Sequence, residues 1–284
     1  MNASIADIVV SFLVLALLGA GFAILISVCY RFLSVKEDPK LELFMSILPG
    51  ANCGACGCAG CLGFAKSLVR ETAEPAGCLA GGASVAAKLA KAMGITVTVQ
   101  EELVAFVACR AGRKAAKRKY DYVGVDNCQA ATLLFGGDKA CEYGCIGLGT
   151  CARACPFDAI AVTDEGLAAV DSSKCRSCRK CVNACPKKII SMVPRNQTVL
   201  VACNNHDRGK KARDVCSIAC IACLICEKNC PAKAITMVNN LAVIDYTTCT
   251  RCGVCVEKCP QKSIILLPGA VPADQNLQMR GGKR

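Results

Sequence analysis

Three stretches of the chain repeat one cysteine spacing, C-x2-C-x2-C-x3-C-P, without a fault, at residues 175–186, 220–231 and 249–260. Three thiolates two residues apart wrap a tight loop around one corner of a metal–sulfur cubane. The proline then ends the loop and directs the fourth cysteine toward a second site. Zinc ribbons use paired C-x2-C runs and lack the triplet that ends in Cys-Pro. The spacing therefore indicates [4Fe-4S] ligation and restricts these stretches to small cluster-binding loops.

Composition supports metal ligation by sulfur alone. The chain has 26 cysteines in 284 residues and a single histidine, His206. All-thiolate sites select zinc or iron–sulfur clusters. His206 lies in a polar, charged stretch, and we interpret it as a solvated loop residue. A disulfide scaffold of this cysteine density is normally short and exported, which does not describe this chain.

The N-terminal segment predicts a membrane anchor. Residues 8–30 are 23 positions without a charge, and about 20 suffice to cross a bilayer. No basic region precedes them, so we expect a retained anchor rather than a cleaved signal. Arg31, Lys36 and Lys40 follow directly, and positive flanks stay inside. The bulk of the chain is therefore expected on the cytoplasmic side of the bacterial inner membrane, where thiols stay reduced.

The segments after each Cys-Pro predict a repeated small fold. Short apolar stretches, AIAV, IISM, AITM and SIIL, follow the four Cys-Pro pairs, and LAAVD or LAVID follows the first stretch of each pair. Asn239 and Asn240 stand where a tight hairpin needs residues that tolerate positive φ. Each half-repeat is thus a hairpin plus a cluster loop, and two halves make one unit that resembles bacterial two-cluster ferredoxins. In the second unit the crossed pairing predicts two ligand sets: Cys220, Cys223, Cys226 and Cys259, and Cys249, Cys252, Cys255 and Cys230.

The first unit departs from this pattern. Its opening run is CEYGCIGLGTCARACP, with Leu148 at the place of Cys223. Alignment on the Cys-Pro pairs matches Cys141 to Cys216, and Cys141 is expected to replace the missing ligand. The predicted sets are Cys141, Cys145, Cys151 and Cys185, and Cys175, Cys178, Cys181 and Cys155.

An earlier run, NCGACGCAGC at residues 52–61, holds four cysteines in ten positions. With the next cysteine it gives C-x2-C-x4-C-x16-C, and the segment 62–74 has helical apolar spacing at Leu62, Ala65, Leu68 and Val69. That helix would return the chain to the last cysteine. The predicted ligands are Cys53, Cys56, Cys61 and Cys78.

This spacing resembles the small iron–sulfur domain in the B subunit of the Rnf ion-translocating electron-transport complex. In that family the position of Cys58 is commonly not a ligand, so the resemblance implies that Cys58 is only a neighbour of the cluster. Corrinoid iron–sulfur methyl carriers share a similar motif, but they lack an anchor and carry a large cobalamin-binding barrel. The order of anchor, four-cysteine domain and ferredoxin units covers nearly the whole chain, as in the longer family members.

The expected architecture is α+β: a single transmembrane helix, a four-cysteine domain and two tandem ferredoxin-like units. The expected parts are an anchor (1–30), a linker (31–50), the four-cysteine [4Fe-4S] domain (51–95), a basic connecting segment (96–135), ferredoxin unit 1 (136–195), a connector (196–215), ferredoxin unit 2 (216–268) and a tail (269–284).

Five [4Fe-4S] clusters are expected, and six cysteines stand outside the five sets. Cys29 ends the membrane span, and Cys58 lies in the first run. The remaining four either hold a sixth cluster or stay as buried or reactive thiols, because free cysteine behaves as a small apolar residue. They are Cys109, Cys128, Cys203 and Cys216.

A basic stretch, residues 109–120, holds six Lys or Arg and no acid. It is either a solvated face or a docking patch for an acidic soluble ferredoxin. No aromatic residues interleave with the charges for bases to stack on, so nucleic acid is not expected as a partner.

The resemblance implies an electron-transfer subunit of an ion-translocating ferredoxin:NAD oxidoreductase, accepting electrons from reduced ferredoxin. It further implies flavin-bearing NADH-oxidising and integral membrane subunits as partners. No stretch of the sequence predicts a flavin or nucleotide site or catalytic residues, so hydride chemistry is expected on a flavin-bearing partner. The alternatives are a stand-alone anchored polyferredoxin that supplies another reductase and pumps nothing, and a thiolate-rich zinc scaffold without redox function.

Overall fold

The computed structural model describes residues 5–33, 38–96 and 102–267, and it divides into two compact units at residue 43. The first unit holds the helix α1 (Ile5–Leu33), which is long and apolar enough to cross a membrane between Val9 and Arg31. Its described side chains are exposed, including Phe12, Leu17 and Ile26. A helix that is apolar all round and covered by no protein suits a lipid environment. The anchor predicted for residues 8–30 thus coincides with this helix.

The four-cysteine domain is helical. After α2 (Pro39–Ile47) come α3 (Gly60–Val69), the 3-10 turns η1 (Pro75–Gly77) and η2 (Leu79–Gly81), and α4 (Gly82–Met93). The buried face of α3 consists of Cys61, Phe64, Ala65 and Leu68, a strict i, i+3, i+4, i+7 pattern. The predicted helix is confirmed over its first turns, but Leu62 is exposed and the helix ends at Val69.

Two ferredoxin units follow, and each contains the predicted hairpin. In the first, β2 (Ile160–Val162) pairs with β3 (Ala168–Val170), and in the second β6 (Ile235–Val238) pairs with β7 (Leu241–Ile244). Asn239 and Asn240 turn the second hairpin with φ of 48° and 63°, as predicted. The remaining strands after Cys-Pro, β4 (Ile190–Pro194) and β8 (Ile264–Leu266), pair elsewhere.

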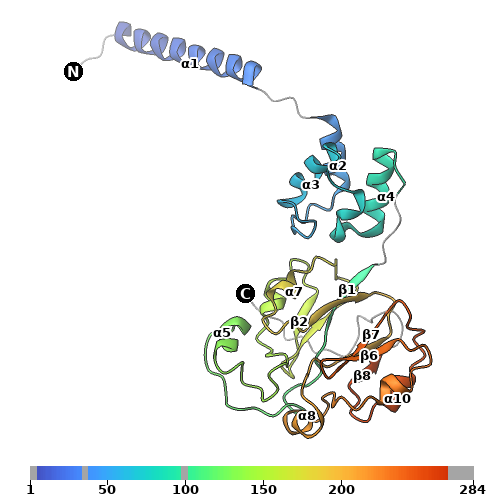
Figure 1. Cartoon of the computed structure of the whole chain (residues 1–284). Helices are drawn as coiled ribbons and strands as arrows, with labels where there is room; N and C mark the ends of the chain where they lie inside the picture. Colours follow the sequence, from blue (N-terminus) through green and yellow to red (C-terminus); the bar gives the residue numbers. More distant parts are fainter. Residues whose placement is uncertain (1–4, 34–37, 97–101, 268–284) are drawn as a thin grey trace. The chain divides into compact units, whose positions relative to one another are not determined.

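Two strands upstream of the cysteine runs complete the units (Figure 1). β1 (Leu103–Val107) pairs antiparallel with β4, and β5 (Val199–Val201) pairs antiparallel with β8. Both strands lie in segments that the sequence predicted as connections, the basic connecting segment (96–135) and the connector (196–215). The correction has a physical reason, since β4 and β8 would otherwise leave their backbone groups without strand partners.

The two units repeat this pairing in the same register. Val107 lies opposite Ile190 and Val201 lies opposite Ile264. The next amide donates across in both units, from Ala108 to the Ile189 carbonyl and from Ala202 to the Ser263 carbonyl, each at 2.8 Å. The sequence Val-Ala-Cys ends each of these segments, at residues 107–109 and 201–203. The internal repeat therefore begins at β1 and β5.

Short helices lie between the strands. They are α5 (Cys128–Leu133), α6 (Thr150–Arg153), α7 (Lys180–Ala184), α8 (Gly209–Val215), α9 (Ile225–Lys228) and α10 (Val254–Lys258). All of them except α8 contain one cysteine. Several cysteines are themselves core residues, packed with β-strand side chains such as Val193, Leu200 and Ile235. Tyr246 packs against the cores of both units. Because cysteine side chains make up much of the core, helices and strands as short as these can pack into a stable fold.

Candidate metal centres

The loop of the four-cysteine domain is held by Asn52. Its Oδ1 accepts a hydrogen bond from the Cys61 amide at 2.8 Å. Gly60 has φ +77°, and a Cβ there would lie 2.7 Å from the same oxygen, so only glycine fits beside it. The loop and the first turn of α3 are therefore fixed against each other.

This loop brings the first predicted set together. Burial raises the pKa of the Cys78 thiol, and neighbouring thiols add to the rise, those of Cys61, Cys56 and Cys53. The Cys58 sulfur instead lies 3.8 Å from the hydroxyl of Ser67 on α3. Burial raises the pKa of the Cys56 thiol, and the thiol of Cys58 adds to the rise, so Cys58 lies beside the group and its exclusion from the ligands stays a prediction.

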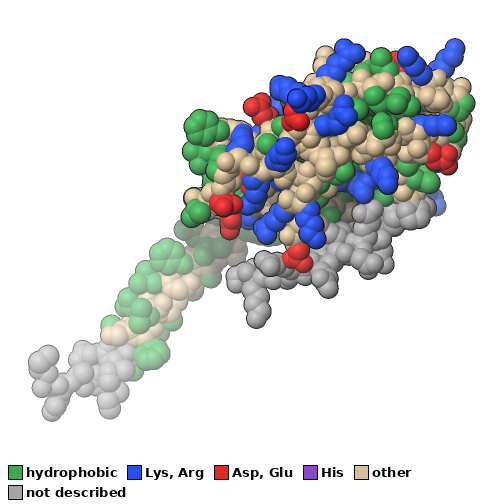
Figure 2. Space-filling view, turned by 90° about the horizontal axis from the view of Figure 1, so that it is seen from below, with side chains coloured by type: hydrophobic (Ala, Val, Ile, Leu, Met, Phe, Trp, Pro, Cys, Tyr) green, Lys and Arg blue, Asp and Glu red, His purple; other side chains and the backbone are tan. Residues whose placement is uncertain are grey.

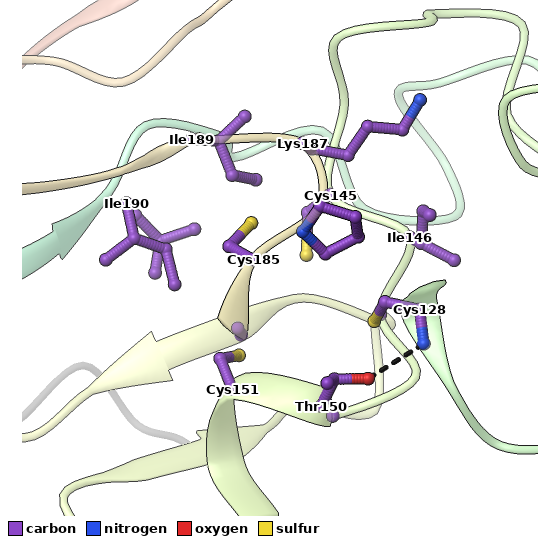
Figure 3. A pocket seen from close by; sticks show the side chains of 14 residues that line it. Cys128, Cys145, Ile146, Thr150, Cys151, Cys185, Lys187, Ile189 and Ile190 are labelled. Atoms are coloured by element: carbon purple, nitrogen blue, oxygen red, sulfur yellow. Dashed lines mark hydrogen bonds between the residues drawn. The ribbon is translucent and has the colours of Figure 1, made fainter. Parts of the chain in front are cut away.

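The first ferredoxin unit has a pocket lined by four cysteines. Figure 3 shows them around one space: Cys128, Cys145, Cys151 and Cys185. Burial, together with the thiols of the other three cysteines, raises the pKa of the Cys151 thiol to about 12. Cys128 begins α5, where the Asn127 side chain caps the helix by accepting from the Gln129 amide at 2.7 Å.

Two contacts hold Cys128 at this cavity. Its amide donates to the Thr150 hydroxyl at 2.8 Å, and the Arg153 guanidinium bonds both the Leu148 carbonyl and the Asp126 carbonyl. Arg153 thereby ties the segment before α5 to the place where the sequence lacks a ligand. The structure corrects the predicted grouping, because Cys128 rather than Cys141 lies with the other three cysteines. Alignment along the chain could not show that a distant helix folds back to fill this position.

The other three predicted sets lie together as expected from the crossed pairing. The thiols that raise the pKa of Cys181 include Cys175, Cys178 and Cys155. Those that raise the pKa of Cys255 are Cys249, Cys230 and Cys252. One pocket is lined by all four cysteines of the remaining set, Cys220, Cys223, Cys226 and Cys259. In these loops the residue before each short helix is left-handed, whether it is Arg179, Leu224 or Gly253.

A further cavity lies between the two ferredoxin units and is lined by four cysteines. They are Cys109, Cys141, Cys203 and Cys216. Each unit supplies two of them from equivalent places, Cys109 and Cys203 after strands β1 and β5, and Cys141 and Cys216 four residues before Cys145 and Cys220. The sequence predicted Cys109, Cys203 and Cys216 as a candidate sixth set together with Cys128. In the structure Cys141 takes the place of Cys128 in this set, and Cys128 takes the place of Cys141 in the first set of unit 1.

The donor chemistry of these groups fits iron–sulfur clusters. Among the described residues, no three His, Cys, Asp or Glu side chains surround a single metal ion. Mononuclear zinc needs its thiolates about 2.3 Å from one centre, whereas the thiolates of a cubane bind four different irons and stand farther apart. His206 is engaged elsewhere, with its Nδ1 2.8 Å from the Asn239 carbonyl and its ring edge-on to Tyr143.

Two family models match the chain at these sites. The Fe-S cluster model matches residues 48–80, and the 4Fe-4S dicluster domain model matches residues 143–190 and 219–264. The first match contains the whole set of the four-cysteine domain. The dicluster matches leave out Cys128 and all four cysteines of the cavity between the units.

Relatives that align over most of the chain decide the family. The B subunit of the Na(+)-translocating ferredoxin:NAD(+) oxidoreductase complex of Acetobacterium woodii is 45% identical over 82% of this chain and 70% of its own length. The B subunit of the ion-translocating oxidoreductase complex of Methanosarcina acetivorans is 40% identical over 83% and 89%. The chain belongs to the family of Rnf B subunits. A third Rnf B subunit, from the proton-translocating complex of Clostridium ljungdahlii, is 37% identical over 84% of both chains.

Proposed function

We propose that this Rnf B subunit is a membrane-anchored relay with six [4Fe-4S] clusters, passing electrons from reduced ferredoxin to the other subunits of its complex. The observation that supports this most strongly is that 24 of its cysteines gather in six groups of four: one in the four-cysteine domain, two in each ferredoxin unit and one between the two units. Family membership supports the complex, since the relatives are named as subunits of ion-translocating ferredoxin:NAD(+) oxidoreductases.

The proposed ligands are the six groups as the geometry brings them together. They are Cys53, Cys56, Cys61 and Cys78; Cys128, Cys145, Cys151 and Cys185; Cys155, Cys175, Cys178 and Cys181; Cys109, Cys141, Cys203 and Cys216; Cys220, Cys223, Cys226 and Cys259; and Cys230, Cys249, Cys252 and Cys255.

The cavity between the units connects their sites. The Cys145 amide donates to the Cys109 sulfur at 3.4 Å, and the Cys220 amide donates to the Cys203 sulfur at 3.3 Å. Cys145 and Cys220 belong to the neighbouring groups of units 1 and 2. Within unit 1, the Cys181 thiol acts electrostatically on Cys151 across its two groups. These contacts place four groups next to one another, the two of unit 1, the one between the units and the group of Cys220, which supports a relay through them.

Most cysteines of the six groups are buried or half-buried. Burial raises the pKa of Cys203 to about 12, so in the metal-free chain this thiol holds its proton at neutral pH, and metal binding releases it. The bound clusters would supply one-electron chemistry. Hydride transfer to a nicotinamide then falls to a flavin-bearing partner.

The orientation in the membrane is part of the proposal. α1 carries Arg31 in its last turn, and a positive flank favours the inner side. The clusters then lie in the cytoplasm, where soluble ferredoxin is found.

The direct test mixes the full chain, purified in detergent without oxygen, with an acidic two-cluster ferredoxin kept reduced. The expected result is that the visible absorbance of the oxidised clusters bleaches within the mixing experiment. Dithionite provides the reference for complete reduction. If dithionite bleached the clusters but reduced ferredoxin left them oxidised, ferredoxin would not be the electron donor. The presence of the clusters would still stand.

Gln197 is expected to tune one cluster. Its side chain is 2% exposed, and its Nε2 donates to the Val199 carbonyl at 2.9 Å and to the Cys249 sulfur at 3.7 Å. Hydrogen bonds to ligand sulfur stabilise the reduced, more negative cluster and raise its potential. Loss of about 1 kcal/mol of this preference corresponds to roughly 40 mV for one electron.

Gln197→Leu should therefore lower the midpoint potential of the cluster at Cys249 by roughly 40 mV, measured by redox titration with electron paramagnetic resonance. The matched control is Gln129→Leu on α5, where the side chain is exposed, which should leave all midpoints in place. An unchanged potential in Gln197→Leu would mean that this amide does not act on the cluster.

A further inference from the structure

One face of the ferredoxin units is strongly basic. It is formed by residues 110–119 and by α8 with the residue before it. Its exposed Lys and Arg are Arg110, Arg113, Lys114, Lys117, Arg118, Lys119, Arg208, Lys210, Lys211 and Arg213. Figure 2 views the molecule from the side on which α8 lies in Figure 1, and it shows many Lys and Arg side chains with few Asp and Glu.

The two segments of this face are joined by the backbone. Ala116 and Cys216 form an antiparallel bridge, the Lys117 amide donates to the Val215 carbonyl at 3.1 Å, and the Ser217 amide donates to the Ala115 carbonyl at 3.0 Å. Small side chains pack beneath, among them Ala111 and Ala212. The charges therefore stand on one continuous, rigid surface and not on two independent loops.

Only part of this charge is neutralised locally. Lys114 pairs with Glu165 at 3.9 Å, Arg118 with Asp138 at 2.9 Å, and Lys211 with Asp207 at 2.6 Å. The other basic residues form no ion pair within residues 102–267, including Arg113, Lys117, Lys210 and Arg213. An excess of unpaired positive charge creates a field that attracts an acidic partner.

Residues 110–116 form part of the wall of the cavity between the units, and α8 packs against this segment through Ala212. Arg110, Ala111 and Ala116 line it together with Cys109 and Cys216. The basic surface is therefore the outer side of the layer whose inner side faces this cysteine group. A partner docked on the surface is separated from the proposed cluster by this one layer of chain.

We propose that the face formed by residues 110–119 and 208–213 is the docking surface for a small acidic one-electron carrier, which exchanges electrons with the cluster of Cys109, Cys141, Cys203 and Cys216. This rests on the proposed function and adds where the carrier binds. α8 buries only Ala212 and presents no large apolar side chains except Val215, so it lacks the apolar face of a membrane-surface helix. The location over a redox site favours a carrier rather than anionic lipid.

The test is charge reversal on the full chain with its clusters loaded. The variant replaces Arg113, Lys117, Lys210 and Arg213 with Glu. The matched control reverses four exposed lysines of unit 2, Lys228, Lys233, Lys258 and Lys262. Binding of an acidic two-cluster ferredoxin is followed by surface-immobilised kinetics, and cluster reduction by stopped flow. Iron content shows whether each variant keeps its fold.

The expected result is an association rate at least about tenfold slower at low salt in the first variant, with the difference shrinking as salt rises. The control should change less than about twofold under the same steering argument. If ferredoxin associated with both variants at the same rate, the docking surface would be overturned. This holds even if ferredoxin reduces the clusters of the wild type normally. A wild type that binds no ferredoxin would overturn the proposed function as well. If the first variant bound ferredoxin as the wild type does but no longer bound vesicles rich in anionic lipid, the face would be assigned to the membrane. That result would overturn the proposal.

Discussion

Replacing Cys109 and Cys203 together with Ala is expected to remove about four irons from each chain. These cysteines occupy equivalent places in the two units and supply half the thiolates of the cavity between them. A cubane that loses two of its four ligands should not be retained. Iron per chain and the number of spins in the fully reduced protein measure the effect, and both should fall by one cluster.

The control removes two cysteines that lie outside all six groups, Cys29 and Cys58. Cys29 is an exposed residue of α1, and Cys58 is engaged with Ser67. This variant should keep its full iron. If the Cys109 and Cys203 variant also kept its full iron, the cavity would hold buried thiols and the relay would break between the units.

Gly147→Ala is expected to destabilise the first ferredoxin unit strongly. Gly147 has φ +86°, and a Cβ there would overlap the carbonyl oxygen of Gly166 and lie 2.8 Å from its carbonyl carbon. Gly166 closes the turn between β2 and β3, so the neighbour is backbone that cannot move without breaking the hairpin. The left-handed conformation costs about 1–2 kcal/mol, and overpacking adds about 1–3 kcal/mol.

Amide hydrogen exchange read by mass spectrometry localises this effect. Peptides of β2 and β3 should exchange at least about thirtyfold faster in Gly147→Ala, because exchange follows the free energy of opening. Gly253→Ala is the matched control. Gly253 also has positive φ, but nothing lies within 4 Å of its Cβ position, and Arg179 and Leu224 occupy the equivalent place in other loops. Equal protection in both variants would show that the contact with Gly166 relaxes easily.

Local sequence rules predicted the parts of the fold that local forces determine. The apolar helix follows from its length, and the hairpin at Asn239 and Asn240 follows from residues that tolerate positive φ. The Cys-Pro loops predicted the groups whose ligands share the repeated spacing. The spacing of apolar residues predicted the helix before Cys78. Its buried face contains Phe64, however, and the predicted core residue Leu62 is exposed.

The position of Cys128 and the cavity between the units depend on contacts between segments that are far apart in the sequence. Cys128 reaches its group because Arg153 and Thr150 hold its segment, and no spacing rule reports that. One signal was present in the sequence: Val-Ala-Cys recurs at residues 107–109 and 201–203. Aligning the units from these tripeptides, instead of from Cys-Pro, would have extended the repeat to β1 and β5 and paired Cys109 with Cys203.

Metal content distinguishes a relay of six clusters from a chain with five clusters or with zinc. Iron, zinc and acid-labile sulfide should be measured on the full chain, purified in detergent without oxygen. Six clusters predict about 24 irons with matching sulfide and little zinc. A content of about 20 irons would contradict the cluster between the units. A few zinc ions with little sulfide would contradict electron transfer by this chain.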